Sequence, residues 1–155
     1  MVPTMEPTTG PAAPARLRTT PSWLLTQTAA HAARLVAGAL DALDARGYHY
    51  RLLAALDELG PASQAELGRR CGIDRSDVVA VLNELAAKDL VRRAPDPADR
   101  RRNVVTLTTA GRRELRRMAD TLDRVQDTLL APLSPTDRGE LTRLLTTLLD
   151  HHSGR

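Results

Sequence analysis

The sequence is poor in aromatic residues and in cysteine, and both shortages limit what the chain can be. Its 155 residues include no Phe, one Trp and two Tyr, so a core must be packed mainly from aliphatic side chains. A single Cys forms no intrachain disulfide, which is typical of a protein in the reducing cytosol. No apolar run approaches the roughly 18 residues of a membrane span, and the N-terminus has no apolar signal-peptide core. We therefore expect one cytoplasmic domain with no membrane partner.

Motifs for catalysis and cofactor binding are also missing from the sequence. It contains no glycine-rich phosphate loop and no nucleophile elbow. None of the four histidines stands at metal-ligand spacing with Cys or another clear ligand; they are His31, His49, His151 and His152. The sequence thus predicts neither an enzyme nor a bound metal or cofactor.

Positive charge is concentrated in one part of the chain. The formal net charge is +3. Residues 90–117 carry nine Arg and three acidic residues, a net of +6, so the remaining residues sum to −3. A basic region of this kind indicates a nucleic-acid partner more strongly than the overall pI does.

Residues 63–86 show the pattern of two short helices joined by a tight turn. Ser63 followed by Glu66 is a capping box, in which the serine accepts from a backbone N–H and the glutamate reaches back. Gly72 suits a turn with positive φ, and Asp74 suits the N-cap of the second helix. An apolar stripe on that helix is formed by Val78, Val81, Leu82 and Leu85. This is the pattern of a helix-turn-helix.

The other face of the second helix carries side chains that suit DNA reading. They are Arg75, Ser76, Val79 and Asn83. Polar side chains of this kind read base edges in the major groove, and an apolar one contacts thymine methyl groups. An ordinary amphipathic surface helix has the same pattern, so the interpretation depends on the segment that follows.

That segment predicts a β-hairpin with a basic tip. Residues 90–93 and 103–108 are the strand candidates, and the loop 94–102 contains two Pro and two Asp, which favour turns. Residues 92–102 hold five Arg and two Asp, and Asp99 can pair with Arg101 at the tip. An arginine loop neutralises phosphates or enters a narrow minor groove. A helix-turn-helix followed by such a hairpin is a winged helix.

The hairpin segment, DPADRRRNVVTLTTAG, resembles the wing of the MarR family of bacterial transcription regulators, where a D-R-R run precedes a strand ending in L-T-x-x-G. The preceding SQAELGRRCGIDRSDVVAVLNELAAKDLVRR is similar to the helix-turn-helix of that family. The likeness covers residues 48–117, and the flanking helices agree in length and order. Two positions depart from the family. Arg102 replaces a residue that is more often small or apolar, and Lys88 stands where glycine is common, which implies a different backbone at that helix end.

The resemblance implies a homodimeric, sequence-specific regulator, usually a repressor, that binds a pseudo-palindromic operator in double-stranded DNA. Two recognition helices would enter major grooves about one turn apart. The residues expected to contact DNA are Ser63, Gln64, Arg75, Ser76, Val79, Asn83, Arg92, Arg100, Arg101 and Arg102.

The predicted fold is mainly α with a small β-hairpin wing. A DNA-binding core (48–111) is flanked by dimerisation helices (22–47 and 112–152), and five Pro in residues 1–21 predict a disordered tail. Helices are expected at 23–45 with Ser22 as N-cap and Gly47 as its end, at 48–59, from Thr108 or Thr109 to about residue 130, and after Ser134-Pro135. The terminal helices offer more apolar surface than the small core can cover, which favours a symmetric dimer over packing within one chain.

A small aromatic acid is a further expected partner, because the family often responds to such effectors between the dimer helices and the winged helix. The candidate residues are Trp23, His31, Arg34, Tyr48 and Tyr50. His31 and Arg34 are three residues apart on one helix face, where imidazole and guanidinium can hold a carboxylate. In the alternative, Arg34 pairs with an acid of a partner chain and His31 fills the interface.

Two other functions stay open from the sequence. The basic wing can serve an acidic protein surface, which would make the chain a protein–protein interaction module. Cys71 can be a redox sensor, although its position in the turn favours a buried structural thiol. Redox-sensing relatives also tend to carry the reactive cysteine in the first helix, where this chain has none.

Overall fold

The computed structural model describes residues 13–154, which form a mainly helical chain with a small sheet. The elements in order are α1 (Ala15–Arg18), α2 (Pro21–Asp41), α3 (Gly47–Leu59), β1 (Ala62–Ser63), α4 (Gln64–Cys71), α5 (Arg75–Ala87), β2 (Val91–Pro95), β3 (Asn103–Leu107), α6 (Thr109–Leu129) and α7 (Pro135–Ser153). The strands form one antiparallel sheet in the order β1-β3-β2. The predicted fold class is confirmed.

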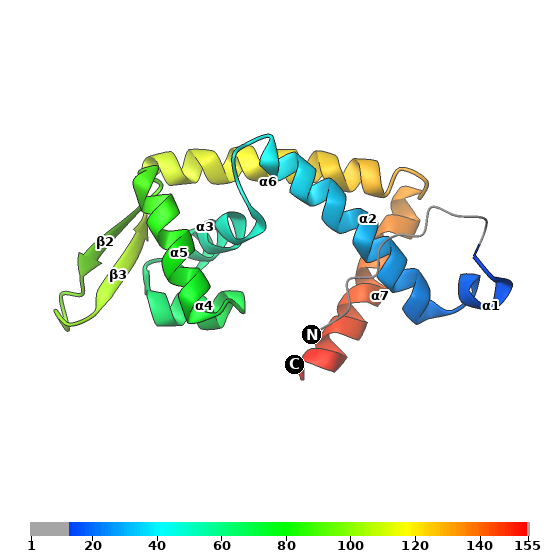
Figure 1. Ribbon diagram of the computed structural model, residues 1–155, viewed down its shortest axis with the longest axis horizontal. Helices are drawn as coiled ribbons and strands as arrows, with labels where there is room; N and C mark the ends of the chain where they lie inside the picture. The colour runs from blue at the N-terminus through cyan, green and yellow to red at the C-terminus, as the bar shows by residue number, and fades with distance from the viewer. Residues whose placement is uncertain (1–12, 155) are drawn as a thin grey trace.

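Helix α6 spans the molecule and separates two ends of different character (Figure 1). The winged helix, made of α3, α4, α5 and the strands, lies below the N-terminal part of α6. Helices α2 and α7 lie at the other end, and α6 packs against both α2 and α3. The predicted start of α6 is confirmed, since the Thr108 hydroxyl accepts the Gly111 N–H at 2.9 Å. Ser134 caps α7 in the same way.

The first long helix differs from its prediction at both ends. Helix α2 begins at Pro21, with Thr20 rather than Ser22 at the N-cap, because proline suits a first turn that needs no N–H. It ends at Asp41, and Asp44 has a φ of 52°, which ends helical geometry before residue 45. Gly47, expected to end this helix, is the first residue of α3.

The predicted disordered tail, residues 1–21, is wrong for its last part. Residues 15–18 form α1, and α2 begins at residue 21. The prolines there lie before or at the first turn of a helix, where proline is tolerated. Residues 1–12 of the predicted tail lie outside the described residues.

The helix-turn-helix of α4 and α5 has the predicted turn but only part of the predicted capping. The Ser63 hydroxyl accepts the Glu66 N–H at 3.2 Å, and Gly72 ends α4 with a φ of 63°. The Glu66 carboxylate does not reach back as predicted, because it pairs with Arg70 one turn further on. Asp74 stands at the N-cap of α5, but its carboxylate accepts no capping hydrogen bond from a backbone N–H.

The sheet contains one strand more than the predicted hairpin. Strand β1 pairs Ala62 with Val105 and so ties the start of α4 to the wing. Two residues beside a proline show no periodicity, which is why the sequence did not indicate this strand. At the end of α5, Asp89 takes the left-handed backbone with a φ of 57°, whereas Lys88 has a φ of −92°. The unusual backbone expected at Lys88 therefore lies at the next residue.

The core is aliphatic, as the composition predicts, and it lies within the winged helix and under α6. Leu52, Leu53, Leu67 and Leu82 are all 0% exposed. A Cβ atom at Gly111 would overlap the carbonyl oxygen of Leu90, so α6 approaches the start of β2 as closely as only glycine allows. The wing is thereby fixed to the long helix.

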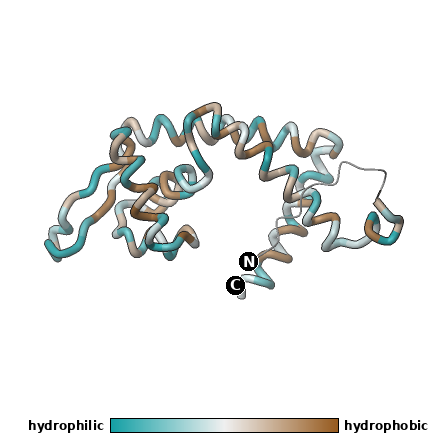
Figure 2. Tube along the Cα trace, in the orientation of Figure 1, coloured by the Kyte–Doolittle hydropathy of each residue, from teal (hydrophilic) through white to brown (hydrophobic). Residues whose placement is uncertain are grey.

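The end of the molecule formed by α2 and α7 leaves much apolar surface uncovered. Helix α7 contains no buried residue. Figure 2 shows hydrophobic positions recurring along α2 and α7. The exposed leucines are Leu24, Leu25, Leu35, Leu144, Leu145, Leu148 and Leu149. Within residues 13–154, no helix has both the length and the hydrophobicity that a membrane span requires.

Candidate nucleic-acid interface

The outward face of α5 presents the four side chains that the sequence assigns to base reading. Arg75, Ser76, Val79 and Asn83 are all exposed, while the apolar stripe on the opposite face is buried. Val79 is 37% exposed although it is apolar. The predicted face of the helix is therefore the free one, and its contact with DNA stays a prediction.

Ser63 and Gln64, at the start of α4, are less exposed than the four side chains of α5. The Ser63 hydroxyl is used as the cap of α4, and the residue is only half-exposed. Gln64 and Arg75 line one shallow cleft of about 420 Å³, in which α4 faces the first turn of α5. The structure thus places Gln64 beside Arg75 at the start of α5, whereas Ser63 acts as the cap of α4.

The wing tip is shaped by aspartate side chains that hold backbone groups. Asp96 Oδ1 accepts the Ala98 N–H at 2.9 Å, and Asp99 Oδ1 accepts the Arg101 N–H at 3.1 Å. The expected ion pair between Asp99 and the Arg101 side chain is not formed, and the aspartate instead accepts the Arg101 backbone N–H in this local turn. All three tip arginines, Arg100, Arg101 and Arg102, are exposed and have no acidic partner among residues 13–154. Their charge is free for an external anion.

Two adjacent arginines at the base of the wing point to opposite faces of β2. Arg92 is exposed and lines a cleft of about 450 Å³ with Thr106 and Arg112. Arg93 pairs in register with the buried Val105 and is half-buried, and its Nε and Nη2 have no hydrogen-bond partner in the described part of the chain. Of these two adjacent arginines, only the predicted Arg92 is exposed to solvent, because residues alternate across a strand.

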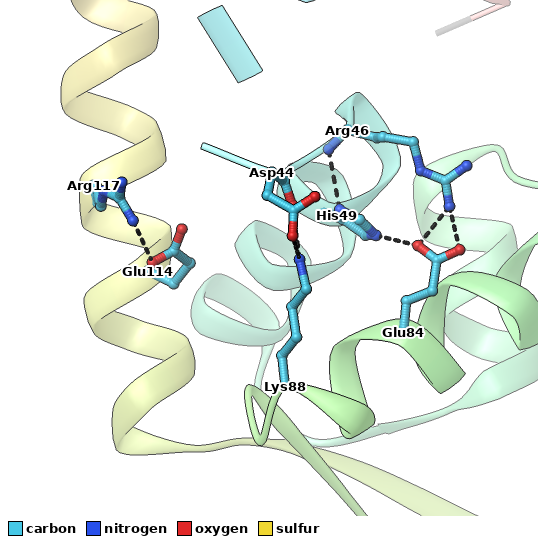
Figure 3. A network of polar contacts seen from close by, with 7 residues as sticks. All are labelled: Asp44, Arg46, His49, Glu84, Lys88, Glu114 and Arg117. Atoms are coloured by element: carbon cyan, nitrogen blue, oxygen red, sulfur yellow. Dashed lines mark hydrogen bonds and ion pairs between the residues drawn. The ribbon is translucent and has the colours of Figure 1, made fainter. Parts of the chain in front are cut away.

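A group of charged side chains joins the back of α5 to the chain between α2 and α3 (Figure 3). Glu84 of α5 pairs with Arg46 and accepts from His49 Nε2 at 2.6 Å. One turn later, Lys88 Nζ donates to the Asp44 carbonyl at 2.7 Å and to its carboxylate at 2.8 Å. We call these five residues the corner clamp. The sequence prediction missed it, although Glu84 and Lys88 are four apart and therefore share a helix face.

The corner clamp lowers the pKa of both its carboxylates. Hydrogen bonds from Arg46 and then from His49 hold the pKa of Glu84 below its ordinary value, and Lys88 does the same to the pKa of Asp44. The clamp also borders a cleft of about 570 Å³. Both basic side chains of that cleft already have acidic partners, so the cleft offers no free cation.

The candidate effector residues are not gathered around any of the clefts described here. Arg34 and His31 do meet, with 2.8 Å between Nη2 and Nδ1, and both are exposed on α2. Tyr48 is exposed under the Arg51 guanidinium, whereas Tyr50 packs partly buried against the core. Trp23 lies in the first turn of α2. The effector assignment stays a prediction, with His31 and Arg34 as its best-placed pair.

Cys71 lies in the turn region and has the surroundings of a structural thiol. It is half-buried, and its Sγ donates to the Arg51 carbonyl at 3.6 Å. Burial raises the pKa of the thiol, which reduces the thiolate that oxidation chemistry requires. These features favour the structural interpretation over the sensor.

Comparison with known proteins places these features among transcription regulators. Residues 43–102 match the sequence profile of the MarR family. The HTH-type transcriptional repressor NicR of Pseudomonas putida is 33% identical over 98 residues, which are 63% of this chain and 62% of that protein. The crystal structure of a probable transcriptional regulator from Pseudomonas aeruginosa is 32% identical, with a TM-score of 0.75, over 86% of this chain and 99% of that one.

A third similar protein is Bordetella bronchiseptica BpsR, whose DNA binding is described as regulated by 6-hydroxynicotinic acid. It is 25% identical, with a TM-score of 0.75, over 89% of this chain and 99% of that chain. The match to NicR spans only about three fifths of that repressor's length. The similarity therefore extends over nearly the whole of two solved structures and over part of the curated relative.

Proposed function

We propose, from the premise that this chain belongs to the MarR family of winged-helix transcription regulators, that it reads a pseudo-palindromic DNA site as a homodimer. The observation that carries the proposal is the exposed face of α5, with Arg75, Ser76, Val79 and Asn83, beside a wing whose tip arginines are unpaired within the described residues. Arginine and asparagine form bidentate contacts to guanine and adenine, respectively. In this proposal α5 supplies sequence preference.

The wing supplies affinity that does not depend on sequence. Arg100, Arg101 and Arg102 neutralise phosphates or enter the minor groove, and each neutralised phosphate releases counterions. The Asp96 and Asp99 turns support this role, because they shape the loop without consuming the arginine charges. An acidic protein surface is the competing partner for the same arginines.

A second copy of the chain is the proposed partner for α2 and α7. The leucines that stay exposed on these helices are typical of an interface, since α7 buries none of its residues within one chain. A symmetric dimer would place two α5 helices on one face of the duplex. Size-exclusion chromatography with light scattering should give twice the mass of one chain.

Repression released by a small aromatic acid is the proposed mode of regulation. The name of NicR, a repressor, and the description of BpsR support it. The hydrogen-bonded pair of His31 and Arg34 can hold a carboxylate on the dimer helix. An aromatic acid should raise the melting temperature and lower DNA affinity, and Arg34→Ala should abolish both effects. Normal responses from Arg34→Ala would exclude this pair.

The DNA proposal is tested by selecting duplexes from a random-sequence library and measuring their affinity in rising salt. We expect enrichment of a two-fold-symmetric sequence and a steep, linear fall of log affinity with log salt. An acidic peptide or protein partner predicts no enrichment. In that case the wing arginines would serve a protein surface.

A further inference from the structure

The corner clamp contacts the C-terminal end of α5 at two positions one turn apart. The partners at both positions belong to the same short segment of the chain. Glu84 lies on α5, and Lys88, four residues later, is the C-cap of that helix. Their partners, Arg46, His49 and Asp44, all come from residues 44–49, where α2 gives way to α3. The helix proposed to read bases is thus connected by side chains to residues 44–49, which lie between the proposed dimer helix α2 and the first turn of α3 (Figure 3).

His49 uses both of its ring nitrogens in this connection. Its Nδ1 accepts the Arg46 backbone N–H at 3.0 Å, which caps the start of α3. The ring proton must then lie on Nε2, which donates to Glu84 Oε2 at 2.6 Å. Because His49 is only 5% exposed, its ring position is fixed by the core, and Glu84 is held against a rigid point.

The negative charge of Glu84 is unfavourable for DNA binding at this place. It follows Asn83 directly, so it brings a negative charge close to the surface that the proposed function gives to DNA. If Glu84 were only a surface residue, its removal should strengthen binding to any duplex. A carboxylate held by two partners in this position instead suits the orientation of α5, because bidentate base contacts need a fixed helix position.

We propose that Glu84 is a positioning residue, which acts through His49 and Arg46 to fix α5 for base reading. This inference rests on the proposed function and deepens it. Glu84 itself reads no base. It sets the rotation of α5 relative to the segment between α2 and α3. The position of Asn83 therefore depends, through the clamp, on the position of the proposed dimer helix. Sequence preference, and not general DNA affinity, is the property that depends on it.

The first test uses the duplex that the wild-type protein selects and a scrambled duplex of equal length and composition. Glu84→Gln should lower affinity for the selected duplex on the order of tenfold, within the range that one good base contact provides. Its affinity for the scrambled duplex should stay equal or rise. Glu58→Gln is the matched control, since Glu58 is an exposed acid on α3 with no ion-pair partner in the described residues. It should change neither preference nor fold.

Two substitutions of His49 separate positioning from stability. Gln can place an amide N–H near the Nε2 position and keep the bond to Glu84, whereas Asn can place an oxygen near Nδ1 and keep the α3 cap. We expect His49→Gln to retain sequence preference and His49→Asn to lose it as Glu84→Gln does. If preference instead follows melting temperature across these variants, the role of the clamp is structural only.

A charge exchange completes the experiment. The double variant Arg46→Glu, Glu84→Arg restores an ion pair with reversed polarity and should recover part of the preference lost in Glu84→Arg alone. An unchanged preference in Glu84→Gln overturns the positioning role and leaves the proposed function intact. A wild-type protein that selects no sequence would overturn both.

Discussion

The two ends of the molecule differ in how much of their apolar surface their own chain covers. The winged helix buries most of its leucines, and Leu52, Leu53, Leu67 and Leu82 are 0% exposed. The other end leaves Leu149 at 66% exposure, and α7 has no buried residue. The first end therefore has a core within one chain, whereas the second leaves an apolar face that the proposed dimer would cover. In the proposed function, the part that reads DNA is thus separate from the part that sets the spacing of two recognition helices.

The largest expected effect on stability comes from a substitution that leaves a cavity in the core of the winged helix. Leu82→Ala removes a fully buried side chain and should lower the free energy of unfolding by about 2–5 kcal/mol. Leu149→Ala should cost less, and its cost should depend on protein concentration because it acts on association. Urea unfolding at two protein concentrations measures both. A concentration-independent loss in Leu149→Ala would contradict the contrast between the ends.

The next effect concerns the dimer. Leu145→Asp together with Leu148→Asp places two charges on the exposed face of α7. We expect a monomer by light scattering, with the far-ultraviolet circular dichroism of a folded winged helix. Affinity for a two-fold site should fall sharply, while affinity for a half-site changes little. A double variant that remains a dimer would mean that α7 is not part of the interface.

The wing gives a smaller effect that is confined to the DNA end. Arg100→Ala with Arg101→Ala removes two exposed charges and should leave the fold stable, since such surface changes cost about 0.5 kcal/mol or less. Affinity for selected and scrambled duplexes should fall together, and the salt slope should decrease by about one for each phosphate that is no longer neutralised. An unchanged slope would remove the wing tip from binding.

Asn83→Ala is expected to act on preference alone. Asn83 is exposed on α5 and carries no charge, so its loss should leave the salt slope unchanged. Discrimination between the selected duplex and single-base variants should fall by about 1–3 kcal/mol at the position it reads. Competition binding against these variants measures the change. Full preference in Asn83→Ala would mean that another part of α5 reads the bases.

The smallest expected effect is a pH dependence of the corner clamp. The pKa of Glu84 is lowered by Arg46 and then by His49, and the pKa of Asp44 is lowered by Lys88. A lowered folded-state pKa contributes stability above the ordinary value, and this contribution is lost as pH falls through the lowered one. The melting temperatures of wild type and Glu84→Gln should therefore differ at neutral pH and converge below about pH 4. A constant difference across this range would contradict the assignment.

The sequence predicts well those elements whose signal is local. The αL turn at Gly72, the caps at Ser63 and Thr108, the start of α7 at Ser134-Pro135 and the free face of α5 are all found where the residues indicate them. The start of α2 was misplaced because Ser22 competes with Thr20 for the N-cap, and only the position of Pro21 decides between them.

The parts that the sequence could not give depend on segments that meet only in the fold. Strand β1 has two residues and exists because β3 lies beside it. The corner clamp joins His49 to Glu84 across 35 positions, and no spacing rule covers such a distance. Local patterns thus indicate the helix that is proposed to read DNA, whereas the contacts proposed to hold this helix in place form only in the folded chain.

The most direct test of the account measures wild-type affinity for the selected and the scrambled duplex over a range of salt concentrations. Sequence-specific reading by α5 with phosphate binding by the wing predicts that log affinity falls linearly with log salt for both duplexes. It also predicts that the selected duplex keeps its advantage at the highest salt, because base contacts release few counterions. Equal affinities for the two duplexes, or binding that does not change with salt, would contradict the central claim.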